Sequence, residues 1–150
     1  MANMEHVQLV KRGRDVVARW REQNPNDVLD LNAAYMSFAR APQVNISGAD
    51  LRNADLMGAV LQRANLSGCH LNPCHLYHAN LREANLTWAR LNGANLRGTN
   101  LSGADLSGAD LDRATLSDAN LSGAKLVNAN LSRANLTGAD LTDADLTGAS

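Results

Sequence analysis

Hydrophobic residues recur at every fifth position along most of the chain. From Leu51 to Leu146 each fifth residue is Leu, twenty times without exception. In the register two residues before Leu, from Ala49 to Ala149, eighteen of twenty-one residues are Ala, and the exceptions are Cys69, Cys74 and Thr99. A period of five fits neither the 3.6-residue period of an α-helix nor the heptads of a coiled coil. The pattern therefore predicts a repeating structure that is not helical.

A glycine follows the central residue of many units at a fixed distance. Ten of the eleven Gly residues sit two positions after it, from Gly48 to Gly148, and only Gly13 lies outside this register. Gly followed by Ala and then Asp or Asn is typical of turns, because Gly adopts backbone conformations that other residues avoid. We interpret each unit as a short extended segment plus a bend, with two residues directed inward and three outward. A chain that bends in every unit must coil, and stacked coils can pair their backbones at strand spacing.

The same register continues upstream with other residues in the central position. Leu31, Met36, Ala41 and Ile46 precede Leu51 at intervals of five. The chain therefore holds twenty-four units between Leu31 and Leu146.

The amino-acid sequence of the units also resembles that of a known family. Residues 104–108 read Ala-Asp-Leu-Ser-Gly, and this A(D/N)LxG pattern, over residues 29–149, resembles the pentapeptide-repeat family. The resemblance implies an all-β solenoid, a right-handed quadrilateral β-helix with four units in each coil. Twenty-four units would then form six coils, a rod about 29 Å tall at ~4.8 Å per coil. Each central Leu would stack on the Leu twenty residues away, and one such core stack consists of Leu51, Leu71, Leu91, Leu111 and Leu131.

Residues 1–28 differ in kind from the repeats of residues 29–150, and we assign them to an N-terminal helical cap. Apolar residues at near-helical spacing predict a helix over residues 5–23, which Gly13 weakens by about 1 kcal/mol and Asn24 ends. Such a helix would cover the apolar end of the first coil, because terminal repeats of a solenoid need a capping element.

The predicted cap helix is also basic, which allows a second interpretation: a helix that binds nucleic acid or a membrane. Acidic residues dilute this charge, so we favour the cap. The stretch 13–22 also resembles the segment that precedes the repeats in cyanobacterial members of the family. The cations are Lys11, Arg12, Arg14, Arg19 and Arg21, and the acids are Glu5, Asp15 and Glu22.

The composition of the 150 residues narrows the class of protein further. Only 3% are aromatic although 45% are hydrophobic, so the core must be built from small and medium aliphatic side chains. A net charge of −1 provides no general attraction for nucleic acid or an anionic membrane. Because the chain has no basic-then-apolar leader and no apolar run near 18 residues, we expect a soluble, cytoplasmic protein that contacts neither membrane nor nucleic acid directly.

The last predicted coil has no cap of its own. Its central residues, Leu131, Leu136, Leu141 and Leu146, would be uncovered, and unpaired strand edges associate readily. We expect either end-to-end self-association of the chain or a natural continuation that covers this coil.

Two cysteines and three histidines lie within residues 69–78, a composition that suggests a zinc site. The register argues against it: Cys69 and Cys74 occupy the inward position, whereas the next residues, His70 and His75, point outward. Haem attachment fails as well, because its motif needs two residues between the cysteines and this stretch has four. We expect no metal and no cofactor, two inert inward thiols and a histidine-bearing outer patch.

Departures from the repeat spelling gather on the outer surface of the central coils. Stacking by twenty residues puts Asp50, His70, Arg90 and Asp110 in one column. This column predicts two weak ion pairs, one between the first two residues and one between the last two. Exposed aromatic, His and Arg side chains are common in binding hot spots, although neutral drift would produce the same departures. The candidate partner-binding residues are His70, His75, Tyr77, His78, Trp88, Arg90 and Arg97.

Catalysis finds no support, because a narrow Leu-filled interior leaves no substrate pocket and the chain holds no Ser-His-Asp set or phosphate loop. We expect a non-enzymatic scaffold that binds an unidentified protein partner, with a regulatory role implied only by the resemblance. The alternative that the resemblance implies is binding to gyrase or another topoisomerase by mimicry of DNA. Mimicry needs an acidic rod, and the net charge is +3 over residues 51–97 but −4 over residues 98–150. A structural spacer is the third interpretation.

Overall fold

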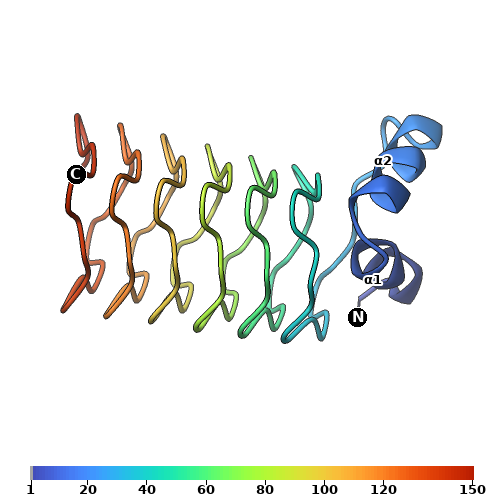
Figure 1. Ribbon diagram of the computed structural model, residues 1–150, viewed down its shortest axis with the longest axis horizontal. Helices are drawn as coiled ribbons and strands as arrows, with labels where there is room; N and C mark the ends of the chain where they lie inside the picture. Colours follow the sequence, from blue (N-terminus) through green and yellow to red (C-terminus); the bar gives the residue numbers. More distant parts are fainter. Residues whose placement is uncertain (1) are drawn as a thin grey trace.

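The computed structural model describes residues 2–150, so Met1, the first residue of the predicted cap region, lies outside the described residues. The chain forms a rod of stacked coils, and two helices pack at the end of the rod that holds the N-terminus (Figure 1). The C-terminus lies at the opposite end. The fold therefore has one long axis, along which the sequence advances coil by coil.

The N-terminal segment contains two helices, α1 (Met4–Lys11) and α2 (Arg14–Gln23). The prediction of one helix over residues 5–23 is wrong in this respect. The reason is Gly13, whose φ of 96° is incompatible with an α-helix. The helical segment is therefore interrupted before α2. Asn3 caps α1, because its side chain accepts hydrogen bonds from the amides of Glu5 and His6.

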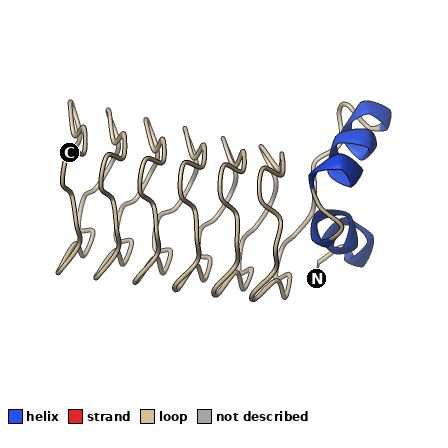
Figure 2. Ribbon diagram, viewed as in Figure 1, coloured by secondary structure: helices blue, strands red, loops and turns tan. Residues whose placement is uncertain are grey.

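Isolated parallel bridges join residues that lie twenty apart, from Asp30–Asp50 to Lys125–Asp145. This register confirms four five-residue units per coil, with residues twenty apart stacked in columns. Within residues 2–150 the structure contains no continuous strand, and Figure 2 accordingly shows only helices and loops. The expected all-β character is therefore reduced to single bridge residues, because the chain bends again before an extended segment can lengthen.

All units except the one that contains Pro73 close through a hydrogen-bonded turn of the same form. In the unit centred on Leu31 the amide of Ala34 donates to the Leu31 carbonyl at 3.0 Å, and the third residue, Ala33, has a φ of 57°. Type II turns require such a positive φ at their third residue. The Asp or Asn before the central residue adds a second bond: the Asp50 carboxylate, for example, accepts from the amide of Arg52 at 3.1 Å. The turn chemistry read from the glycines is confirmed.

The core consists of the inward Leu and Ala columns. In the predicted stack, Leu51, Leu71, Leu91 and Leu111 are fully buried, whereas Leu131 in the last coil is only partly buried. Thr99 replaces Ala at one inward position, and its hydroxyl donates to the Leu76 carbonyl at 2.7 Å. Every inward polar group that lies in the middle of the rod must find such a partner, because no water reaches it.

The two helices cover the first coil. Val7, Val10 and Val17 are buried against it. The Arg21 guanidinium donates to the carbonyls of Asn45 at 2.8 Å and Ser47 at 2.7 Å. These bonds satisfy backbone groups that would otherwise form a free edge. At the other end of the rod the leucines of the last coil are partly exposed, with Leu146 at 41%.

Replacing Leu96 by Ala should destabilise the protein by about 2–5 kcal/mol, because Leu96 is fully buried in the middle of the rod and its removal leaves a cavity. Leu146→Ala is the matched control, since this Leu of the last coil is already 41% exposed and should lose less. Urea unfolding followed by circular dichroism measures both. Equal losses at the two positions would contradict the burial described here.

The thiols of Cys69 and Cys74 should be unreactive in the folded protein. Burial raises the pKa of both to about 12, and only the thiolate is a good nucleophile. Each Sγ also faces a backbone carbonyl, that of Ile46 at 3.0 Å or Ala54 at 3.3 Å. Iodoacetamide at about pH 8 should therefore modify neither Cys until denaturant is added. Mass spectrometry detects the modification. Rapid modification of either thiol in the native protein would show that this side chain does not point into the core.

Candidate functional site

Four turns per coil give the rod four faces, and two of them carry unusual side chains. We call the units centred on residues 36, 56, 76, 96, 116 and 136 the aromatic face. The units centred on 41, 61, 81, 101, 121 and 141 are the next along each coil, and we call them the arginine face. Because residues twenty apart lie in one column, a feature of either face can be followed from coil to coil.

Four of the predicted site residues lie together on the aromatic face. His75, Tyr77 and His78 belong to one turn, and Arg97 belongs to the equivalent turn of the next coil. The His78 amide donates to the Arg97 carbonyl at 3.0 Å. The rings of Tyr77 and His78 contact each other, with 4.0 Å between their centroids. The structure therefore brings these four residues into one small patch.

Three large apolar side chains extend this patch toward the N-terminal end. Tyr35 is 84% exposed, Phe38 67% and Met57 36%. The Phe38 amide donates to the Met57 carbonyl at 2.7 Å, and the Gly58 amide donates to the Tyr77 carbonyl at 2.9 Å, so consecutive coils hold these turns in line. Together they form a stripe of exposed aromatic and thioether groups across the first three coils.

Sequence reasoning missed Tyr35 and Phe38 as part of this surface. The signal was available, because they precede His75 and His78 by forty residues, which is two coils. It was overlooked because the first coil differs from the consensus Leu and Ala residues at several positions. An aromatic residue in that coil is therefore one departure among many.

Two rings of the aromatic face rest on glycines of the following coil. A Cβ atom added to Gly58 would lie 2.6 Å from the Phe38 ring, and one added to Gly98 would lie 2.5 Å from the His78 ring. The ring-bearing residues both have positive φ, 57° and 55°. Each ring is thus packed against the wall on one side, and this contact fixes its position on the surface.

The other predicted residues lie elsewhere on the rod. Trp88 belongs to a unit two turns away from the aromatic face, on the opposite side of the coil. Its ring covers Gly108, where an added Cβ would lie 2.5 Å from the indole, and it remains 71% exposed. The sequence-based patch is therefore divided between faces, with Trp88 and Tyr77 on opposite sides of the rod.

His70 and Arg90 lie in the predicted column with Asp50 and Asp110, since bridges join all four in order. The two predicted ion pairs within the column are wrong. Asp50 instead binds Arg52 of its own turn, through Nε at 2.9 Å and Nη2 at 2.6 Å, and this hydrogen bonding lowers the pKa of Asp50 to about 2. Asp110 accepts from the Asn130 amide group at 2.9 Å.

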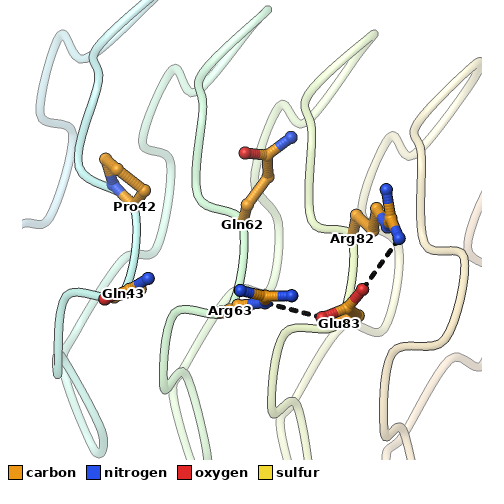
Figure 3. Close-up of a pocket in the computed structure, with 6 residues that line it drawn as sticks. All are labelled: Pro42, Gln43, Gln62, Arg63, Arg82 and Glu83. Atoms are coloured by element: carbon orange, nitrogen blue, oxygen red, sulfur yellow. Dashed lines mark hydrogen bonds and ion pairs between the residues drawn. The ribbon is translucent and has the colours of Figure 1, made fainter.

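The arginine face holds an open groove of about 240 Å³ (Figure 3). At the end of this groove nearer the C-terminus, Glu83 accepts from Arg63 Nε at 2.6 Å and pairs with Arg82 Nη2 at 3.0 Å. The hydrogen bond from Arg63 is the main cause that lowers the pKa of Glu83 below its ordinary value. A second groove of about 260 Å³ adjoins the first and shares Arg82 and Glu83 with it. The first groove is lined by Pro42, Gln43, Gln62, Arg63, Arg82 and Glu83.

The described residues, 2–150, also bear on metal and membrane binding. No group of three or more His, Cys, Asp or Glu side chains in this part of the chain is placed to hold a metal ion. Cys69 and Cys74 are buried, whereas His75 is exposed on the far side of the wall. Neither α1 nor α2 is long and apolar enough to cross a membrane.

The chain is similar to several solved pentapeptide repeat proteins. One from the Arabidopsis thaliana thylakoid lumen is 36% identical over 69% of this chain, with a TM-score of 0.46. HetL, involved in heterocyst differentiation regulation in the cyanobacterium Nostoc, is 26% identical over 89% of this chain and 94% of its own, with a TM-score of 0.28. QnrB1, a plasmid-mediated fluoroquinolone resistance protein, is 20% identical over 79% of this chain, with a TM-score of 0.34.

The chain spans 65% of the length of the Arabidopsis protein and 66% of that of QnrB1. No curated protein matches its sequence significantly. The model of pentapeptide repeats, in contrast, matches eight copies over residues 34–72, 79–118 and 114–150. Since these ranges cover well over half of the sequence and coincide with the coils, the chain belongs to the pentapeptide-repeat family.

Proposed function

We propose that the chain is a non-enzymatic protein-interaction module and that the aromatic face of its first four coils makes the contact. The observation that carries this proposal is the stripe on one face of the rod formed by the exposed Tyr35, Phe38 and Met57 and continued by the partly exposed Tyr77. Large exposed apolar groups in a row are the usual mark of a protein contact surface.

The position of the aromatic residues supports this interpretation. Phe38 and His78 occupy the left-handed turn position, where a residue other than Gly costs roughly 1–2 kcal/mol. Eleven other non-glycine residues carry the same cost, so it is common to the turns of this rod. The rings of Phe38 and His78 differ in that each packs one side on a glycine of the next coil and stays exposed on the other, and aromatic residues are enriched among interface hot spots.

The rigidity of the rod supports it as well. Backbone hydrogen bonds hold each turn of the aromatic face to the next, for example Phe38 to Met57 and His78 to Arg97. A surface that is fixed before binding loses little conformational entropy when a partner docks. The face can thus contribute affinity through few side chains.

The grooves of the rod favour binding over catalysis. Both are open, and the groove in Figure 3 contains an Arg–Glu–Arg cluster whose carboxylate is already bound by two guanidiniums. A general base works best with a pKa near the working pH, whereas the hydrogen bond from Arg63 lowers the pKa of Glu83 below its ordinary value. The proposal therefore includes no reaction.

The test is a pull-down from a lysate of the source organism with three baits. The first is the wild-type chain, the second has Tyr35, Phe38 and Tyr77 all changed to Ala, and the third is the opposite-face control Trp88→Ala. Each hot-spot truncation costs about 2 kcal/mol or more, so the triple variant should lose its partner while the control retains it. Thermal melts should match, because all three side chains point outward.

Equal recovery with all three baits would contradict the proposal. It would leave the aromatic stripe as neutral drift and favour the third interpretation from the sequence, a structural spacer.

A second candidate function is binding to gyrase through mimicry of a DNA duplex. One observation favours it: residues 98–150 carry a net charge of −4. The N-terminal half opposes it, because residues 51–97 carry +3 and include Arg63 and Arg82 of the arginine face. Duplex mimicry needs a continuous row of negative charges, which this rod has along only half of its length.

A supercoiling assay separates the two functions. We expect gyrase to supercoil relaxed plasmid at an unchanged rate in the presence of excess protein, because the basic half of the rod cannot stand in for phosphates. Inhibition that disappears when Asp140 and Asp145 are changed to Asn would instead make duplex mimicry the leading function.

A further inference from the structure

We propose that the arginine face of the first four coils is a docking groove for a short acidic protein segment in extended conformation. This inference goes beyond the proposed function, because it concerns a different face and gives the chemistry of what binds there.

The shape of the groove suits an extended chain. The two depressions share Arg82 and Glu83 and continue one another along the rod, from Pro42 in the first coil to Gly103 in the fourth. Three steps between coils of ~4.8 Å span about 14 Å, and an extended peptide advances ~3.3 Å per residue. The groove thus matches a segment of about four residues.

The cations of the groove have hydrogen-bond donors to spare. A guanidinium has five N–H donors and no acceptor. Arg63 gives Nε–H to Glu83, Arg82 gives one N–H of Nη2, and both side chains remain more than half exposed, at 62% and 59%. Glu83 therefore holds two guanidiniums on neighbouring coils, as Figure 3 shows, without using up their donors. Such planar forks bind carboxylates in a bidentate manner.

The charge of this face also favours an acidic ligand. Over the first four coils it carries the exposed Arg40 together with Arg63 and Arg82, against the single acid Glu83. The net charge of this part of the face is +2. Opposite charges across a groove steer a partner toward it and fix its position.

The far end of the same face limits the length of the ligand. In the fifth coil residues 119–123 are uncharged, and in the sixth coil the face becomes acidic with Asp140 and Asp143. A nucleic-acid duplex or another long polyanion laid along the rod would meet these carboxylates and be repelled. A short acidic protein segment reaches the cations without reaching the acids, which is why we assign this occupant.

The test is fluorescence anisotropy with fluorescein-labelled hexaglutamate in about 20 mM salt, where electrostatic attraction is weakly screened. Wild-type protein should bind the peptide, and binding should weaken as salt is added. Changing both Arg63 and Arg82 to Gln should weaken it by about tenfold or more, because each change removes charge-assisted hydrogen bonds. Unchanged thermal melts establish that this variant is folded.

The matched control is a second Arg–acid–Arg cluster, in which Asp112 contacts Arg113 at 3.7 Å and Arg133 at 3.0 Å. It lies in the acidic half of the rod. Changing Arg113 and Arg133 to Gln should alter hexaglutamate binding by less than about twofold, since screening confines surface charges to short range. The Tyr35, Phe38 and Tyr77 triple variant should also retain hexaglutamate binding, so failure of this proposal is distinguishable from failure of the aromatic face.

Three results would overturn the inference. They are absence of hexaglutamate binding by the wild-type protein, an equal loss of binding in the Arg113/Arg133 control, and binding of a 20-base-pair duplex at the same groove more tightly than hexaglutamate. The last result would assign the groove to nucleic acid.

Discussion

The left-handed bend two residues after the central residue of nearly every unit is the constraint on which the rest of the structure depends. Ten glycines and thirteen other residues adopt positive φ there, which accounts for twenty-three of the twenty-four units; the remaining unit has Pro73, whose ring excludes such a φ. Because the chain turns at fixed intervals of five, Leu and Ala always return to the inside and residues twenty apart always meet. The buried core, the backbone bridges between coils and the columns of surface residues all follow from this repeated positive φ.

The same constraint decides what the surface can display. A side chain at the turn position projects over the turn of the next coil, so a bulky ring fits where that next turn has Gly. Phe38 over Gly58, His78 over Gly98 and Trp88 over Gly108 all follow this pairing. Glycine in the repeat thus has two roles. It allows the bend of its own unit, and it leaves space for a ring from the preceding coil. On the aromatic face, Phe38 and His78 fit because large residues and glycines alternate along their column.

The period of five was enough to predict the turns, the inward Leu and Ala columns and the inward thiols, and the family resemblance added the register of twenty. Sequence reasoning failed where a hydrogen bond within one turn competes with a pairing between coils. Asp50 was expected to pair with His70 of the next coil, yet Arg52, two residues along the same turn, binds it first. A fifth-residue count also could not show that Gly13 divides the cap into two helices, because this depends on the backbone at a single position. The opposite directions of Trp88 and Tyr77, in contrast, follow from the register of twenty, since their units are two turns apart.

The aromatic and arginine faces are neighbours on the same coils, and this arrangement bears on how a partner would be held. Consecutive turns join them, with Phe38 leading to Arg40 and His78 leading toward Arg82 along the chain. A partner with an apolar surface and an acidic flank would meet both faces without any movement of the rod, so the entropy of orientation would be lost only once. The net charge of −4 over residues 98–150 would repel the same acidic flank. Attraction at one half of the rod and repulsion at the other would together fix such a partner at the first four coils.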